Sequence, residues 1–426
     1  MLPELTPPAR ENASATNIFN WLLDGLGGVN VNRAAASCNL DDLRAAAAIL
    51  AERKLDCREV RVQNTCTQSS VLFCGWHADI VSGHALRGFQ WERDLWTFVI
   101  GAFMHDLLRS PSCKDSPARC RAVGFLDIGV NIGDWLTPLR LALPGVPMVG
   151  IEGSPANVAL ATANVAESMR RARQSAACRF SVANTRIMPF AFLSASELRI
   201  ARRVGGVCFS QDFANVCGPQ ACWVAAEPTR VRYLLTWPHG APRAQVGSRG
   251  LPTHLEDAAA RLAMQACPIK ARAAGTTLGA VLRTVNNPFV IKIDIEGHES
   301  LALSTVGNAW QDRPPCYAII EVSIDGLAGA QSAAALHTLV HACGYDAVWV
   351  HGPHIAAPRP WLPSFTANHT LKANRSQLGV HMVARLQRYV KAAWDGQPSI
   401  PLPLRYVDAV LGFADTPRCV RRLLSG

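Results

Sequence analysis

The feature that most constrains the fold is a regular alternation of short apolar runs and longer helical patterns in the middle of the chain. Buried parallel strands are typically short continuous apolar runs, and a helix usually connects two parallel neighbours. The alternation therefore predicts an α/β fold with a mostly parallel, doubly wound sheet and helices on both faces. The expected strands lie at 123–128, 147–151, 180–192, 289–295, 317–322 and 347–350, with strand-like pieces at 207–235, and the expected helices at 133–143, 154–173, 277–284 and 331–343.

The flanking sequences depart from this alternation and divide the chain into three parts. Residues 1–90 are punctuated by Pro, Gly and Asn, which predicts an irregular N-terminal extension with one helix at 40–54. An apolar helix at 92–108 opens the predicted core, 91–350, which carries a Pro/Gly-rich insertion around 237–275 with a helix near 255–265. Several prolines after residue 352 begin a Pro-rich linker and a partly helical C-terminal extension, 351–426.

The strongest local motif is Asp127-Ile-Gly129-Val-Asn131-Ile-Gly133, at the point where a predicted strand becomes a helix. The glycines allow a sharp turn and a close approach of the backbone to a ligand. Asp127 ends the first strand, and Glu152 ends the next one. Open α/β sheets bind ligands at this carboxyl edge, where an acid after the second strand accepts the hydroxyls of a ribose. The motif therefore predicts a nucleotide-like ligand, although an ordinary Gly-rich turn is the simpler alternative.

The identity of the first residue favours one class of ligand. A dinucleotide loop has Gly there, so that a helix N-terminus can bind the pyrophosphate. Asp127 would repel a diphosphate but would attract an amino group or a sulfonium. The motif therefore favours S-adenosylmethionine (SAM) over NAD.

A second group of charged residues follows the strand expected at 289–295. Lys292, Asp294 and Glu296 alternate with Ile, which places them on one side of the strand and its exit, and His298 follows. Charges on a central strand are costly to bury unless they are paired or bind a ligand. These four residues are the candidate catalytic residues, and a structural ion-pair cluster is the alternative. His298 and Glu299 do not have a diagnostic metal-ligand spacing, so the sequence predicts no metal site.

Charge and composition narrow the classes of partner. The chain is 49% hydrophobic and 17% charged, which excludes a disordered protein. Its net charge of +10 would attract anions, but the basic residues are scattered without interleaved aromatic residues, so a nucleic-acid partner is not favoured. The apolar stretch at 96–108 is shorter than the roughly 18 residues that a membrane span needs, and no signal peptide is recognised, which predicts a soluble protein. The sequence sets neither the oligomeric state nor the localisation.

The 14 cysteines leave the compartment open. They form no pair of C-x-x-C units, so a structural zinc site is not supported. Short-range disulfides are conceivable in two places, among Cys57, Cys66 and Cys74 and between Cys113 and Cys120. Three N-glycosylation triplets, at residues 12, 368 and 374, would also suit an oxidising compartment.

Five motifs in order resemble the FkbM family of SAM-dependent methyltransferases. They are the Asp127–Gly133 motif, Ile-Glu-Gly-Ser-Pro-Ala-Asn at 151–157, Thr-Leu at 277–278, Lys-Ile-Asp-Ile-Glu-Gly at 292–297 and Ile-Glu at 320–321. The resemblance covers roughly residues 91–350 and implies a class I methyltransferase that usually methylates oxygen. The fold that it implies is a Rossmann-like, seven-stranded, mostly parallel, doubly wound sheet. It also implies a SAM site formed by Asp127, Gly129, Asn131, Gly133, Glu152 and Asn157. The chain departs from the family at Gly279, where an acid is usual, and at Gly153, where a Pro is usual.

The sequence therefore predicts a SAM-dependent enzyme that methylates a hydroxyl of a sugar, glycan or other small molecule. A Rossmann-like binding module without catalysis is the main alternative, and an NAD-linked oxidoreductase is a second one. Transfer of the methyl group requires alignment of the acceptor and removal of its proton.

Overall fold

The computed structural model describes part of the chain. The described residues are 55–62, 70–77, 79–90, 92–174, 183, 185–192, 207–209, 269–271, 274–285, 288–295, 299–312, 314–323, 339, 343–345, 347–351, 406–413 and 415–425. The helices expected at 40–54 and near 255–265, and most of the one at 331–343, lie outside these residues.

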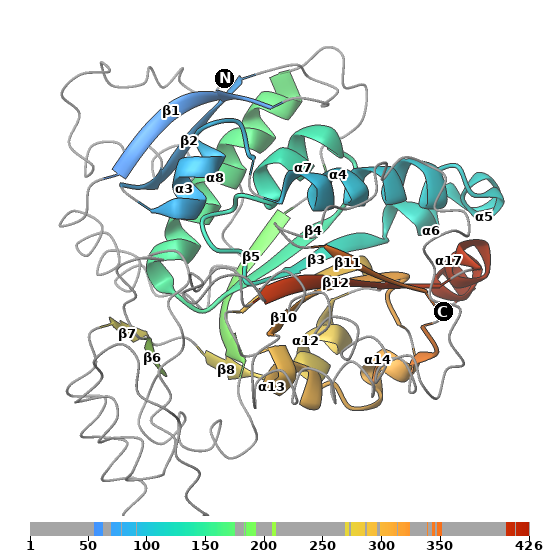
Figure 1. The fold of residues 1–426 in the computed structure, drawn as a ribbon. Helices are drawn as coiled ribbons and strands as arrows, with labels where there is room; N and C mark the ends of the chain where they lie inside the picture. The colour runs from blue at the N-terminus through green and yellow to red at the C-terminus, as the bar shows by residue number, and fades with distance from the viewer. Residues whose placement is uncertain are drawn as a thin grey trace, which may run out of the picture.

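An eight-stranded sheet forms the centre of the described part (Figure 1). Its strands run in the order β11 (Ala347–His351), β12 (Tyr406–Gly412), β10 (Tyr317–Ser323), β9 (Pro288–Ile293), β3 (Gly124–Ile128), β4 (Met148–Glu152), β5 (Thr185–Phe192) and β8 (Ala274–Thr276). From β10 to β8 all neighbours pair in parallel, whereas β12 is antiparallel to both β10 and β11. The parallel strands therefore bring their carboxyl ends to one edge.

Helices cover both faces of this sheet (Figure 1). One face carries α4 (Arg93–Gly101), the π-helical turn η2 (Ala102–Leu107), α7 (Leu136–Ala142) and α8 (Pro155–Gln174); the other carries α12 (Leu278–Thr284), α13 (Glu299–Ser304) and α14 (Asn308–Asp312). The two faces have separate cores, because successive side chains of a strand point to opposite sides. In β10, Tyr317 and Ile319 join the first core, while Ala318 and Ile320 join the second.

A hairpin from the predicted N-terminal extension packs on α8. Its strands are β1 (Leu55–Arg61) and β2 (Ser70–Trp76), followed by α3 (Ile80–Ala85). The Asn164 amide of α8 binds the backbone of Cys74 twice, accepting from its N–H at 3.0 Å and donating to its carbonyl at 2.8 Å. This buried side chain therefore makes the two backbone hydrogen bonds that a neighbouring strand would make, and it fixes the hairpin to the core.

Five short or terminal elements complete the described structure. The helices α5 (Pro111–Asp115) and α6 (Pro117–Arg121) precede β3, the strands β6 (Val207–Phe209) and β7 (Ile269–Ala271) pair with each other, and α17 (Thr416–Ser425) follows β12. The buried side of α17 is apolar, since Val420, Leu423 and Leu424 are all buried. None of the described helices is long and apolar enough to cross a membrane.

The expected α/β class and mostly parallel sheet are confirmed, and two details differ. The described sheet has eight strands where seven were expected, because the three-residue β8 adds to the edge of β5. The predicted end of the core at residue 350 is too early, because β12 inserts between β10 and β11. This strand is a short apolar run whose partners lie far from it in sequence.

Candidate functional site

Polar side chains gather on one face of the sheet, where the parallel strands end. Asp127 of β3 lies opposite Lys292 of β9 in the strand register, so both side chains point to the face that α7 covers. Glu321 of β10 faces Asp408 of β12 in the same way. The predicted residues at the ends of β3 and β9 are therefore brought together, as the sequence suggested.

The Asp127–Gly133 motif forms a tight loop between β3 and α7. Gly129, Asn131 and Gly133 have φ values of +90°, +56° and +82°. The Gly129 N–H donates to the carbonyl of Ile151 at 2.8 Å, which joins the loop to β4. A Cβ at Gly129 would overlap with the carbonyl oxygen of Asp294. This glycine is therefore required by the close approach of two protein segments, whereas the sequence suggested that it makes room for a ligand.

Asp127 carries a buried carboxyl group that bears directly on ligand binding. It is fully buried, and neither of its carboxylate oxygens has a hydrogen-bond partner among the described residues. Burial raises its pKa to about 8, although the nearby Lys292 ammonium acts in the opposite direction. A buried carboxyl group without partners is costly, and a cationic or hydrogen-bond-donating ligand would compensate for that cost.

Glu152 is held by the loop that precedes it and by the turn that follows it. Its Oε2 accepts from the N–H of Asn131 and its Oε1 from the N–H of Ser154, both at 2.8 Å. Burial raises its pKa to about 7, while these backbone N–H groups lower it. Each carboxylate oxygen can accept a further hydrogen bond, so Glu152 still has the acceptors that a ribose needs.

The two asparagines predicted for the site differ in their surroundings. The Oδ1 of Asn131 is buried and has no hydrogen-bond partner among the described residues, so it is available to a ligand. Asn157, by contrast, is buried against the N-terminal hairpin and accepts a hydrogen bond from the indole N–H of Trp76 at 3.1 Å. This contact gives Asn157 a structural role that the sequence did not indicate.

Buried Lys292 and partly exposed Asp294 form an ion pair, with 2.8 Å between Nζ and Oδ2. The ammonium also lies 4.9 Å from the ring centroid of Trp135, whose indole N–H donates to Glu92 at 2.7 Å. Burial alone would lower the pKa of Lys292, but the surrounding carboxylates, Asp294 first, raise it well above its usual range. Lys292 is therefore a cation at neutral pH and does not act as a proton acceptor.

Carboxyl groups from outside the predicted motifs surround this ion pair. Burial, and then the charge of Asp408, raise the pKa of Glu92 well above its usual range. Burial raises that of Asp134 to about 7, against the effect of Lys292. The sequence offered little signal for two of these residues, because Glu92 precedes α4 and Asp408 lies in β12, far from the motifs in sequence.

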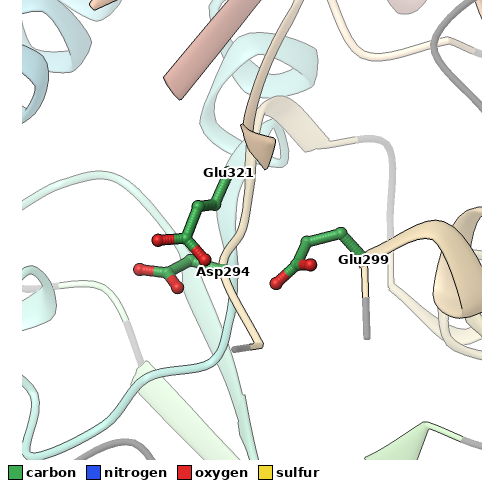
Figure 2. A group of neighbouring side chains, drawn as sticks. All are labelled: Asp294, Glu299 and Glu321. Atoms are coloured by element: carbon green, nitrogen blue, oxygen red, sulfur yellow. The ribbon is translucent and has the colours of Figure 1, made fainter. Parts of the chain in front are cut away.

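Three carboxylates could hold a divalent cation. Ligand oxygens of Asp294, Glu299 and Glu321 lie within 4.8 Å of one another, and Figure 2 shows the Glu299 side chain pointing toward the carboxylates of the other two. Hard cations such as Mg²⁺ and Ca²⁺ prefer oxygen ligands of this kind. Within the protein, Asp294 binds Lys292, and Glu299 accepts from the N–H of Ile295 at 2.8 Å.

The remaining candidates, Glu296 and His298, lie outside the described residues. In comparisons with known proteins, no family model, no curated protein and no solved structure matches the chain.

Proposed function

We propose that this chain is a SAM-dependent methyltransferase that methylates a hydroxyl group of a sugar, glycan or other small molecule. The observation that carries the proposal is the buried carboxyl group of Asp127, whose two oxygens have no hydrogen-bond partner among the described residues. Asp127 lies next to the last residue of β3, at the carboxyl edge of a mostly parallel sheet, and this is the edge where such sheets bind ligands.

The arrangement around Asp127 suits a ligand with a cationic end and a ribose. Asp127 would accept from the amino group of SAM, and Glu152, at the end of the adjacent strand, would accept from its ribose hydroxyls. The unpartnered amide oxygen of Asn131 lies in the loop between them. A dinucleotide fits less well, because its pyrophosphate would approach the buried carboxyl group of Asp127.

The topology of the sheet supports the same class of protein, a SAM-dependent methyltransferase. A doubly wound sheet whose parallel strands are followed by an antiparallel one fits the Rossmann-like core of a class I methyltransferase, with β8 as an addition at the edge. The five sequence motifs that resemble the FkbM family lie largely on this sheet and its adjoining loops.

Bound SAM would supply a methyl group that is open to in-line attack by the acceptor oxygen. The tasks of the protein are then to align the acceptor, exclude water and take up the acceptor proton. Lys292 supplies a fixed positive charge. Asp134, whose pKa is raised to about 7, is a described carboxyl group that suits proton uptake. Asp294, which is paired with Lys292, is the other described carboxyl group among the candidate catalytic residues.

Transfer of radiolabelled methyl groups from SAM to a panel of sugars, phenolics, lipids and RNA tests this proposal. We expect label on a hydroxyl-bearing sugar or small molecule, and we expect Asp127→Asn to abolish it. If SAM binds but no acceptor is labelled, the alternative of a binding module replaces the enzyme. If RNA alone is labelled, the proposed acceptor class is wrong.

A further inference from the structure

Six cysteine side chains of the described part form three disulfides: Cys57–Cys74, Cys113–Cys120 and Cys316–Cys419. They lie in three separate places, since the first joins β1 to β2, the second joins α5 to α6, and the third joins the start of β10 to α17. Each pair therefore has to be explained by its own local structure.

The first two pairs are cross-links within small elements. Cys57 and Cys74 are directly opposite each other in the register of the β1–β2 hairpin. Cys113 and Cys120 are buried and join two five-residue helices. Helices this short have little stability in water, so a covalent link between them is a physically useful addition.

The third pair closes a loop of 103 residues and connects distant parts of the chain. Both cysteine residues are buried, with Cys316 1% and Cys419 7% exposed. The next residue, Tyr317, donates its hydroxyl to Asp106 of η2 at 2.7 Å. The disulfide thus holds α17 against the sheet beside β12, the strand that carries Asp408 into the candidate site.

A seventh cysteine of the described part, Cys343, is a free thiol. It is buried, and burial raises its pKa to about 12, so it is a poor nucleophile at neutral pH. The structure therefore contains both paired cysteines and an inert thiol, which provides an internal control for their chemistry.

We propose that this chain matures by oxidation in an oxidising compartment, where these three disulfides form and hold the fold together. In each step two thiols form one S–S bond and release two protons and two electrons. The electrons reduce the disulfide of a thiol–disulfide oxidoreductase to a dithiol. Disulfides persist in oxidising compartments and are rare where glutathione keeps thiols reduced. The inference stands on the cysteine pairs and does not depend on the proposed methyltransferase activity.

The test compares two preparations of the full chain, one secreted through an oxidising compartment and one made in a reducing cytosol. Free thiols are alkylated in denaturant, and the protein is then digested without reductant for mass spectrometry. We expect the three cross-linked peptide pairs in the secreted protein, with Cys343 alkylated. The proposal would be overturned if the secreted protein is folded and melts cooperatively while all seven of these cysteines are alkylated.

Melting with and without reductant provides a second readout. Reduction should lower the Tm of the secreted protein by on the order of 10 °C, since the third disulfide closes a long loop. The Cys316→Ala/Cys419→Ala double variant should lose most of this shift, whereas Cys343→Ala should keep it. If either variant fails to fold, the peptide map of the wild-type protein still decides. A wild-type Tm that does not respond to reductant contradicts the proposal.

Discussion

The affinity for SAM should depend on pH through Asp127. The pKa of this buried carboxyl group is raised to about 8, so in the free protein it is mostly protonated at pH 7. A cationic amino group binds the ionised form, and binding must therefore release a proton. Because the carboxyl group of Asp127 has to lose its proton first, the affinity for SAM rises as the pH rises towards 8.

The size of the effect follows from the fraction of Asp127 that is ionised. With a pKa of about 8, this fraction increases about ninefold between pH 6 and pH 7, which corresponds to about 1.3 kcal/mol of binding free energy. The amino group of SAM remains mostly protonated in this range, since α-amino groups have pKa values of roughly 7.7 to 8.0. About one proton should be released for each SAM that binds at pH 7.

Isothermal titration calorimetry at pH 6 and pH 7, in two buffers with different ionisation enthalpies, measures the affinity for SAM and the number of protons released. The Asp127→Asn variant keeps the size of the side chain and should bind SAM more weakly at pH 7. Its affinity should retain at most the smaller pH dependence that comes from Glu152, whose pKa is about 7. An affinity of the wild-type protein that is constant or falls between pH 6 and pH 7 would refute this reasoning.

Three further predictions concern single variants. Glu152→Gln should weaken SAM binding by about 1 to 3 kcal/mol in calorimetry, since a carboxylate acceptor is lost; an unchanged dissociation constant in a folded variant would remove Glu152 from the site. Asp294→Asn should lower turnover by at least about tenfold while the SAM dissociation constant changes little; a lower Tm with normal specific activity would make its pairing with Lys292 purely structural. Gly129→Ala should destabilise the fold by about 3 kcal/mol or more in denaturant unfolding, because its Cβ would overlap with the carbonyl oxygen of Asp294 and its φ is +90°; wild-type stability would contradict the close approach.

The part of the site that could be predicted from the sequence is the part that local rules determine. Asp127, Glu152 and Lys292 all lie at or near the ends of strands that read as short apolar runs. Parallel neighbours bring such ends to one edge, so the order of motifs along the chain was enough to place these residues together.

The rest of the site depends on contacts between distant segments. Asp408 reaches it because β12 pairs with β10 after a long excursion of the chain. Glu92 reaches it through the indole of Trp135, a contact between the residue before α4 and the loop before α7. No periodicity or spacing in the sequence encodes such pairings.

Two residues of the predicted motifs have roles that only the packing shows. Asn157 accepts from Trp76 of the hairpin, a region to which the sequence assigned no definite structure. Gly129 is constrained by the backbone at Asp294, so its substitution disturbs the fold before it tests a ligand. In both cases a motif residue serves the scaffold of the site rather than the ligand.

The central claim is that the edge of the sheet at Asp127 binds SAM, and calorimetric titration of the full chain with SAM and with NAD tests it most directly. The account predicts saturable binding of one SAM per chain, no comparable binding of NAD, and a strong loss of SAM affinity in Asp127→Asn. Binding of NAD at least as tight as that of SAM, or SAM binding that Asp127→Asn leaves unchanged, would contradict it.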